Sequence, residues 1–265
     1  MRLCWLRHPL SAPGLRVEWT ASDQLAIRVG VFNDDPAGPC DIDPQVCNPH
    51  GLEFRLKDEP YVVGEVEYKY NQNGGGLPGT IKLGGWGDFG NFDDQRFDDT
   101  GLSLADPDSS DVARRYDGNY GFYAILDQQI FASADGGETV SAFAHVMGAP
   151  SNRNLVDYYV DGGLVFADFV PGRSKDRFGV AAAIAGISNQ ASDLDRDTVS
   201  FGTNTPIRND ETLMEANYIA EIAPGWTFQP DFQYVWRPGG NVPDESGTKP
   251  LGDAAIIGAR TTINY

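Results

Sequence analysis

The chain has 265 residues, a formal net charge of −18 and a pI near 4.3. This excess of carboxylates argues against nucleic-acid binding, which needs a positively charged surface. Mean hydropathy is −0.35, and no run reaches the roughly 18 apolar residues of a membrane helix. Because the 31 glycines and 11% aromatic residues are typical of strands and turns, we expect a single β domain over residues 1–265.

The beginning of the chain predicts a hairpin and then a long loop. Apolar and polar residues alternate over 14–20 and 25–31, and Ser22 and Asp23 form a typical turn between them. Residues 34–50 are rich in Asp, Pro and Cys and predict a loop. Cys40 and Cys47 in this loop are either a local disulfide, if the compartment is oxidising, or two free thiols. Residues 1–10 contain no apolar segment of the length that a signal peptide needs; if the protein is exported, the chain is therefore either a fragment or begins at a wrong start codon.

The middle of the chain repeats this alternation. Strands are predicted over 52–57, 62–70, 80–89, 119–132, 139–147, 156–166 and 177–187, with long loops at 90–118 and 188–210. In the second of these strands Glu65, Glu67 and Lys69 make one face fully charged. The core of a packed sandwich would not tolerate such a face, because unpaired buried charges are costly.

The last three predicted strands are 214–222, 226–237 and 253–265; the second has aromatic residues near both ends, and the third ends on Tyr265. In the second, every aromatic residue falls on one face and polar residues fall on the other. Trp and Tyr favour membrane–water interfaces, and barrel strands carry girdles of them. The predicted membrane-facing girdle is Trp226, Phe228, Phe232, Tyr234, Trp236 and Tyr265.

About 12 strands, joined alternately by short turns and long loops, predict an antiparallel transmembrane β-barrel of the outer-membrane porin type. The polar strand faces would then line a water-filled pore. The alternative is a secreted soluble β-sandwich, either a carbohydrate-binding protein or a glycosidase. The pore-lining candidates are Arg16, Glu18, Arg28, Glu53, Arg55, Glu65, Glu67, Lys69, Asp157, Asp161, Glu215 and Arg260.

Motifs for catalysis, cofactors or metals are weak. Residues 74–79 match the spacing of a dinucleotide-binding loop, but a strand rather than a helix follows. Asp193, Asp195 and Asp197 resemble the start of a calcium loop that lacks the required Gly and Glu. We therefore predict that the protein is not an enzyme and has no cofactor and no metal.

Several segments, in order, resemble the OprB family of carbohydrate-selective porins. They are 8–14 (HPLSAPG), 77–80 (LPGT), 82–86 (KLGGW), 118–123 (GNYGFY), 127–129 (DQQ), 149–155 (APSNRNL), 171–173 (PGR) and 229–234 (QPDFQY). The resemblance corresponds to the C-terminal two-thirds of the family. It implies a barrel of about 16 strands in the lipid of the bacterial outer membrane, with sugars as transported solutes. It also implies that the barrel-assembly machinery recognises the terminal aromatic residue, Tyr265. It also implies that N-terminal strands are missing here.

Overall fold

The computed structural model describes residues 13–35, 46, 57–134 and 136–264. The described residues form one antiparallel sheet of eleven strands, in which every strand pairs with its neighbours in the chain. The strands are β1 (Gly14–Thr20), β2 (Leu25–Asn33), β3 (Pro60–Tyr70), β4 (Gly79–Asp98), β5 (Ala113–Ala132), β6 (Thr139–Gly148), β7 (Val156–Ala167), β8 (Arg177–Ile187), β9 (Glu211–Ala223), β10 (Trp226–Trp236) and β11 (Ala254–Ile263), and one helix, α2 (Asn189–Ser200), lies between β8 and β9.

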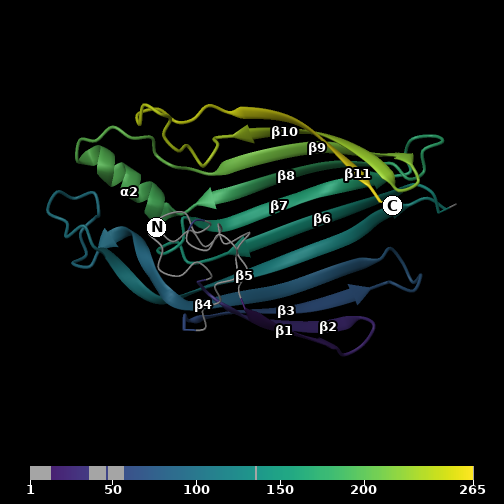
Figure 1. Ribbon diagram of the computed structural model, residues 1–265, viewed down its shortest axis with the longest axis horizontal. Helices are drawn as coiled ribbons and strands as arrows, with labels where there is room; N and C mark the ends of the chain where they lie inside the picture. Colours follow the sequence, from purple (N-terminus) through teal and green to yellow (C-terminus); the bar gives the residue numbers. More distant parts are fainter. Residues whose placement is uncertain (1–12, 36–45, 47–56, 135, 265) are drawn as a thin grey trace.

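The connections differ at the two ends of the sheet. At the right of Figure 1 the chain reverses through 21–24, 71–78, 133–138, 168–176 and 224–225. At the left lie 99–112, 149–155, the segment 188–210 that contains α2, and 237–253. Apart from the short connection 149–155, the described segments show the predicted alternation of short turns and long loops. This asymmetry is the usual one for outer-membrane barrels.

One face of the sheet carries the predicted polar residues. Following paired residues from strand to strand, Lys69 on β3 leads through Asp127 on β5 and Phe143 on β6 to Glu215 on β9. Successive side chains of a strand alternate between faces, so residues two positions away share this face. The predicted pore-lining residues on it are Arg16, Glu18, Arg28, Glu65, Glu67, Lys69, Asp157, Asp161, Glu215 and Arg260.

The opposite face is apolar and exposed. A single row of paired residues crosses ten strands with an aromatic residue at each end. The row is Trp19, Ile27, Val66, Leu83, Ala124, Val146, Val160, Ile184, Thr212 and Trp236. Phe122 and Ile257, on the same face, are 67% and 85% exposed. An apolar surface of this extent is not stable against water and needs another apolar medium or partner.

Within the described residues there is no second sheet to cover either face. The buried apolar residues are few and scattered: Ala26, Phe92, Ile187, Ala191, Ala220 and Val235. A β-sandwich would place a continuous apolar core between two sheets. The alternative of a soluble sandwich is therefore wrong for this part of the chain.

The predicted loop at 90–118 is shorter than expected. β4 continues to Asp98 and β5 begins at Ala113, so the loop covers 99–112. The alternation breaks because the β4–β5 register shifts between Asp88 and Asn91 and again before Asp98, and each β-bulge changes which face the next residue occupies. Asp98 is fully buried and organises the loop, accepting hydrogen bonds from the backbone amides of Thr100, Leu102 and Ser110.

The segment 188–210, predicted as a loop, contains α2. The helix begins after Ser188, whose hydroxyl accepts a hydrogen bond from the amide of Ala191 at 3.2 Å, a normal N-cap. The prediction was wrong here because polar residues occupy most of the helix and leave a weak apolar pattern. Among the described residues, no helix is long and apolar enough to cross a membrane.

β1 and β11 are the two edges of the described sheet. Every neighbouring pair of strands is antiparallel, so all odd-numbered strands run in the same direction. β1 and β11 therefore run parallel to each other. Eleven strands are described where about 12 were predicted; the remaining one, 52–57, lies almost entirely outside the described residues.

Candidate pore-lining face

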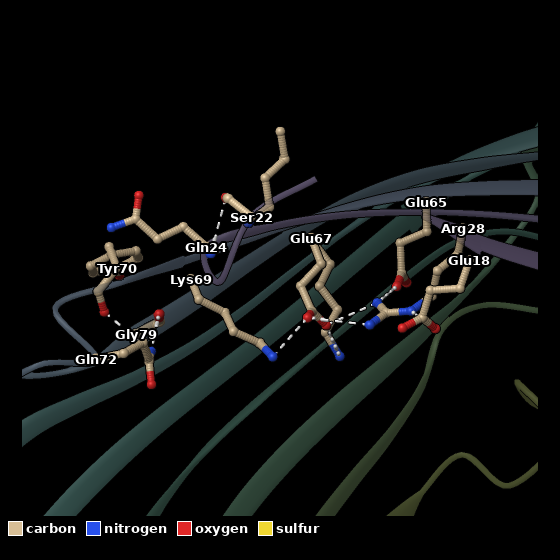
Figure 2. Close-up of polar contacts among 12 residues, drawn as sticks. Glu18, Ser22, Gln24, Arg28, Glu65, Glu67, Lys69, Tyr70, Gln72 and Gly79 are labelled. Carbon is tan, nitrogen blue, oxygen red and sulfur yellow. Dashed lines mark hydrogen bonds and ion pairs between the residues drawn. The ribbon is translucent and has the colours of Figure 1, made fainter. Parts of the chain in front are cut away.

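A cluster of charges occupies the polar face near β1, β2 and β3. The guanidinium of Arg28 donates to Glu65 Oε1 and Glu67 Oε2, both at 2.9 Å, and to Glu18 Oε2 at 3.0 Å. Arg28 lies opposite Glu18 on β1 and Glu65 on β3, so the sheet register itself brings these groups together. Figure 2 shows these side chains projecting from the same side of the strands, with Arg28 between the three carboxylates.

Two lysines complete the cluster around Glu67. Lys69 Nζ lies 3.2 Å and Lys82 Nζ 3.7 Å from the Glu67 carboxylate, whose side chain is 7% exposed. Glu65 accepts a further hydrogen bond from the Tyr123 hydroxyl at 3.0 Å. Every carboxylate of the cluster is therefore paired with a cation, and the side chains of five strands, β1 to β5, are held in fixed positions. Such a fixed pattern of charges can select among solutes that pass close to it.

Charges on the rest of the polar face form smaller groups. Asp161 on β7 pairs with His145 Nδ1 on β6 at 3.0 Å. Glu215 accepts hydrogen bonds from the side-chain amides of Asn217 at 2.8 Å and Gln233 at 3.2 Å. Arg260 lies opposite Gln229 on the edge strand β11.

Some predicted site residues lie outside the described residues. They are Glu53, Arg55, Cys40, Cys47 and Tyr265. Their predicted roles in the pore lining, the disulfide and the girdle stay predictions.

The other predicted girdle residues lie on the apolar face. Trp226 and Phe232 are 42% and 47% exposed. The rings of Tyr234 and Trp236 contact each other edge to face, with their centroids 4.7 Å apart. The indole nitrogen of Trp226 donates to the Thr261 hydroxyl on β11 at 2.8 Å. Their rings are turned away from the charged face, which is the arrangement a lipid-facing girdle requires.

α2 forms a second polar centre at the end of the sheet with the longer loops (Figure 1). Arg96 on β4 donates to Asp193 at 2.8 Å and to Asp197 at 2.8 and 3.1 Å, and Arg208 donates to Asp195 at 2.7 Å. The hydrogen bonds from Arg96 hold the pKa of the Asp197 carboxyl below its usual value. The three aspartates that resemble a calcium loop are thus paired with arginines.

Sequence reasoning missed several residues of the polar face and of the polar centre at α2. Lys82 belongs to it, and its alternation with Ile81 and Leu83 could have revealed this. Tyr123 could not be assigned because Phe122 beside it is equally aromatic. Arg96 gave no signal, since its partners are about a hundred residues away in the chain.

Known proteins share both the sequence pattern and the fold. The model of the family described as "Carbohydrate-selective porin, OprB family" matches residues 2–265. The chain belongs to the OprB family. The family is one of channels rather than enzymes, and the all-β antiparallel fold predicted from the alternation is confirmed.

Relatives within and around the OprB family are distant in sequence. Porin B of Pseudomonas aeruginosa (strain PAO1) is 22% identical over 247 residues, which make up 89% of this chain and 52% of Porin B. The high-pH structure of Pseudomonas putida OprB superimposes with a TM-score of 0.79 at 22% identity, over 96% of this chain and 59% of that one. The low-pH structure of the same protein gives 0.52 at 18% identity, over 94% of this chain and 53% of that one. This chain thus spans about half the length of Porin B.

Proposed function

We propose that this chain forms most of the wall of an outer-membrane porin through which sugars diffuse. One observation carries the proposal: a single continuous sheet is exposed and apolar on one face and charged on the other. A sheet with these two faces suits lipid on one side and a water-filled lumen on the other. Membership of a carbohydrate-selective porin family supports sugars as the solute.

The role of the charged face in this proposal is to select the solute and not to react with it. A sugar passing along the wall exchanges part of its hydration for hydrogen bonds to fixed carboxylates and cations. The cluster around Arg28 and Glu67 is the densest such region among the described strands. The predicted pore-lining residues are assigned to this role, and the aromatic residues of the apolar face to contact with outer-membrane lipid. Recognition of Tyr265 by the barrel-assembly machinery belongs to the same proposal.

The edges β1 and β11 restrict how the wall is completed. Direct pairing of the two would form a parallel seam, because both strands run in the same direction. Single-chain bacterial barrels have even numbers of strands with antiparallel seams. We therefore propose that an odd number of further strands closes the wall, since an unpaired edge in lipid leaves a row of polar backbone groups unsatisfied.

Liposome swelling with D-glucose tests the transport function. The chain is reconstituted alone and in a form extended by further strands, and swelling in glucose is compared with swelling in a large oligosaccharide. Swelling in glucose that requires the further strands, and is absent in the oligosaccharide, is the expected result. No glucose-dependent swelling in either preparation would contradict the proposal.

A crosslink tests how the wall closes. In a variant whose cysteines at 4, 40 and 47 are replaced by serine, Val17→Cys on β1 and Ala259→Cys on β11 are introduced on the apolar face. A disulfide needs Cα atoms within about 7 Å, so we expect none to form under oxidation. A pair on the neighbouring strands β10 and β11, Phe232→Cys with Ile257→Cys, which lie opposite each other, is the positive control. Efficient crosslinking of 17 to 259 would show that eleven strands close on themselves.

A further inference from the structure

A cavity of about 270 Å³ on the polar face has a mostly apolar lining that includes four aromatic side chains. It extends from β3 to β7, so five neighbouring strands contribute to it. Its main lining residues are Tyr61, Trp86, Tyr123, Met147, Asn154 and Asp157. A mostly apolar lining with a few polar groups at fixed positions is typical of sites for small molecules.

The aromatic rings of the cavity are positioned by glycines on the facing strands. A Cβ atom on Gly121 would come within 2.6 Å of the Trp86 indole nitrogen, and one on Gly84 within 2.2 Å of the Tyr123 ring. Each of these two rings therefore lies over the glycine that is paired with it on the neighbouring strand, in the space that a side chain there would otherwise fill. Tyr61 stacks on Trp86 with ring centroids 6.0 Å apart and planes inclined by 27°. Tyr61 and Trp86 therefore form an aromatic platform on the charged face, and Tyr123 lines the same cavity.

Polar groups with fixed orientation surround this platform. The Tyr123 hydroxyl donates to Glu65 at 3.0 Å. The side-chain amide of Asn154 exchanges hydrogen bonds with that of Asn119 at 2.8 and 3.0 Å, which fixes its orientation. The carboxylate of Asp157 lies at the start of β7, where the register with β8 shifts. These groups offer acceptors to hydroxyl groups at the edge of a ring that is seated on the platform.

On these grounds we propose that the cavity is a stacking subsite for a single pyranose ring. The proposal rests on the proposed function, since it names where a sugar would rest along the wall. A pyranose has an apolar face of C–H groups, which packs on aromatic rings, and hydroxyls around its edge, which bond to carboxylates and amides. The volume is just below the roughly 300–1,000 Å³ of most ligand pockets, so it suits one ring and not an oligosaccharide.

A second, larger cavity of about 510 Å³ adjoins the first and shares Asp157 and Tyr158 with it. It lies beneath α2 and is lined by the charged residues Arg196, Arg208 and Asp210. Its lining is polar where that of the first is aromatic. The two cavities are therefore neighbours, with the larger one on the side of the helix.

Calorimetric titration of the detergent-folded chain with D-glucose tests the subsite without requiring transport. Sorbitol serves as the matched probe, because it has the same hydroxyl chemistry but no ring face. We expect saturable binding of glucose and at least about tenfold weaker binding of sorbitol, which corresponds to about 1.4 kcal/mol. Absence of saturable glucose binding, or equal binding of the two probes, would overturn the proposal.

Variants assign the binding to the platform. Trp86→Ala is expected to weaken glucose binding at least about tenfold, whereas Trp226→Ala on the apolar face should leave it unchanged. Gly121→Ala keeps every polar group but displaces the Trp86 ring, so it should weaken binding as well. If Trp86→Ala does not fold, Tyr61→Leu takes its place. Equal binding by the platform variants and Trp226→Ala would refute the subsite. Glucose swelling without calorimetric binding would refute only the subsite, whereas binding without swelling would refute only transport.

Discussion

Arg96 on β4 and Asp197 on α2 are joined by two hydrogen bonds, at 2.8 and 3.1 Å, although 101 residues separate them. The helix follows β8, and β5, β6 and β7 lie between β8 and β4 in the sheet. Four strand spacings, about 19 Å in total, separate β8 from β4, and a helix of twelve residues is about 18 Å long, so α2 reaches β4 by lying across the end of the sheet. α2 therefore connects two distant parts of the wall at the end with the longer loops (Figure 1).

The pH dependence of this connection follows from the pKa of Asp197. Hydrogen bonds from Arg96 lower it below 3.8 in the folded protein. A group with a lowered folded pKa contributes stability above its unfolded pKa and loses it as the pH falls through the folded value. We expect α2 to stay docked from pH 8 to about 4 and to detach only in stronger acid.

Spin labels at Val199→Cys on α2 and Val112→Cys beside β5 would report the docking as a distance. Both side chains are exposed, and the native cysteines are replaced by serine. Asp197→Asn should broaden the distance distribution at pH 7. Arg196→Gln, which removes an exposed ion pair within the helix, is the control and should not. Detachment of the wild-type helix already at pH 6 would contradict this prediction.

Arg28→Gln should destabilise the chain and make the lumen more selective for cations. The change leaves Glu18, Glu65 and Glu67 without their shared guanidinium. Hydrogen bonds to charged groups contribute about 1.5–3 kcal/mol each, and water in the lumen reduces this, so we expect a loss of about 1–3 kcal/mol. Urea unfolding in detergent measures the stability, and the reversal potential in a salt gradient measures the selectivity. Arg16→Gln, at the exposed edge of the same cluster, should have a much smaller effect on stability; equal losses would argue against a central role for Arg28.

Phe232→Arg should prevent stable insertion into bilayers. Phe232 lies in the middle of β10 on the apolar face, opposite Ala216 and Ile257. An arginine on the lipid side of a barrel costs roughly 2–4 kcal/mol at the midplane of the bilayer. The neighbouring change Gln233→Arg places the same charge on the polar face and should be tolerated. The fraction folded in liposomes across a urea series compares the two, and similar losses for both would mean that the two faces are wrongly assigned.

Two glycines in the strands should respond differently to alanine. A Cβ on Gly163 would lie 2.5 Å from the carbonyl oxygen of Val180, whereas the Cβ of Gly64 would meet nothing within 4 Å. Forcing an atom against the backbone costs about 1–3 kcal/mol. Gly64→Ala should be neutral or stabilise by up to about 1 kcal/mol, because alanine restricts the unfolded chain. Chemical unfolding in detergent checks both, and a Gly163→Ala variant as stable as Gly64→Ala would contradict the close approach.

The sequence alone determined which residues share a face. Alternation along a strand has a period of two residues and depends only on the local backbone. Lys69 and Glu215 were therefore assigned to the same face without knowledge of the strands between them, and the register places them in one row. The turn at Ser22 and Asp23 was readable for the same reason, because turn chemistry is local. Alternation failed where β-bulges shift it, as in β4 after Asp88, and where neighbouring residues on both faces are aromatic, as at Phe122 and Tyr123.

The tertiary structure decided everything that depends on partners distant in the chain. The charges around Arg28 and Glu67 were visible in the sequence, but their pairing required the register of β1, β2 and β3. The bond between Arg96 and Asp197 required α2 to lie across the end of the sheet, and the platform of Trp86 required a glycine 35 residues later, on β5. No local pattern records these relationships, because they arise only when strands pair side by side and the helix packs against a distant strand.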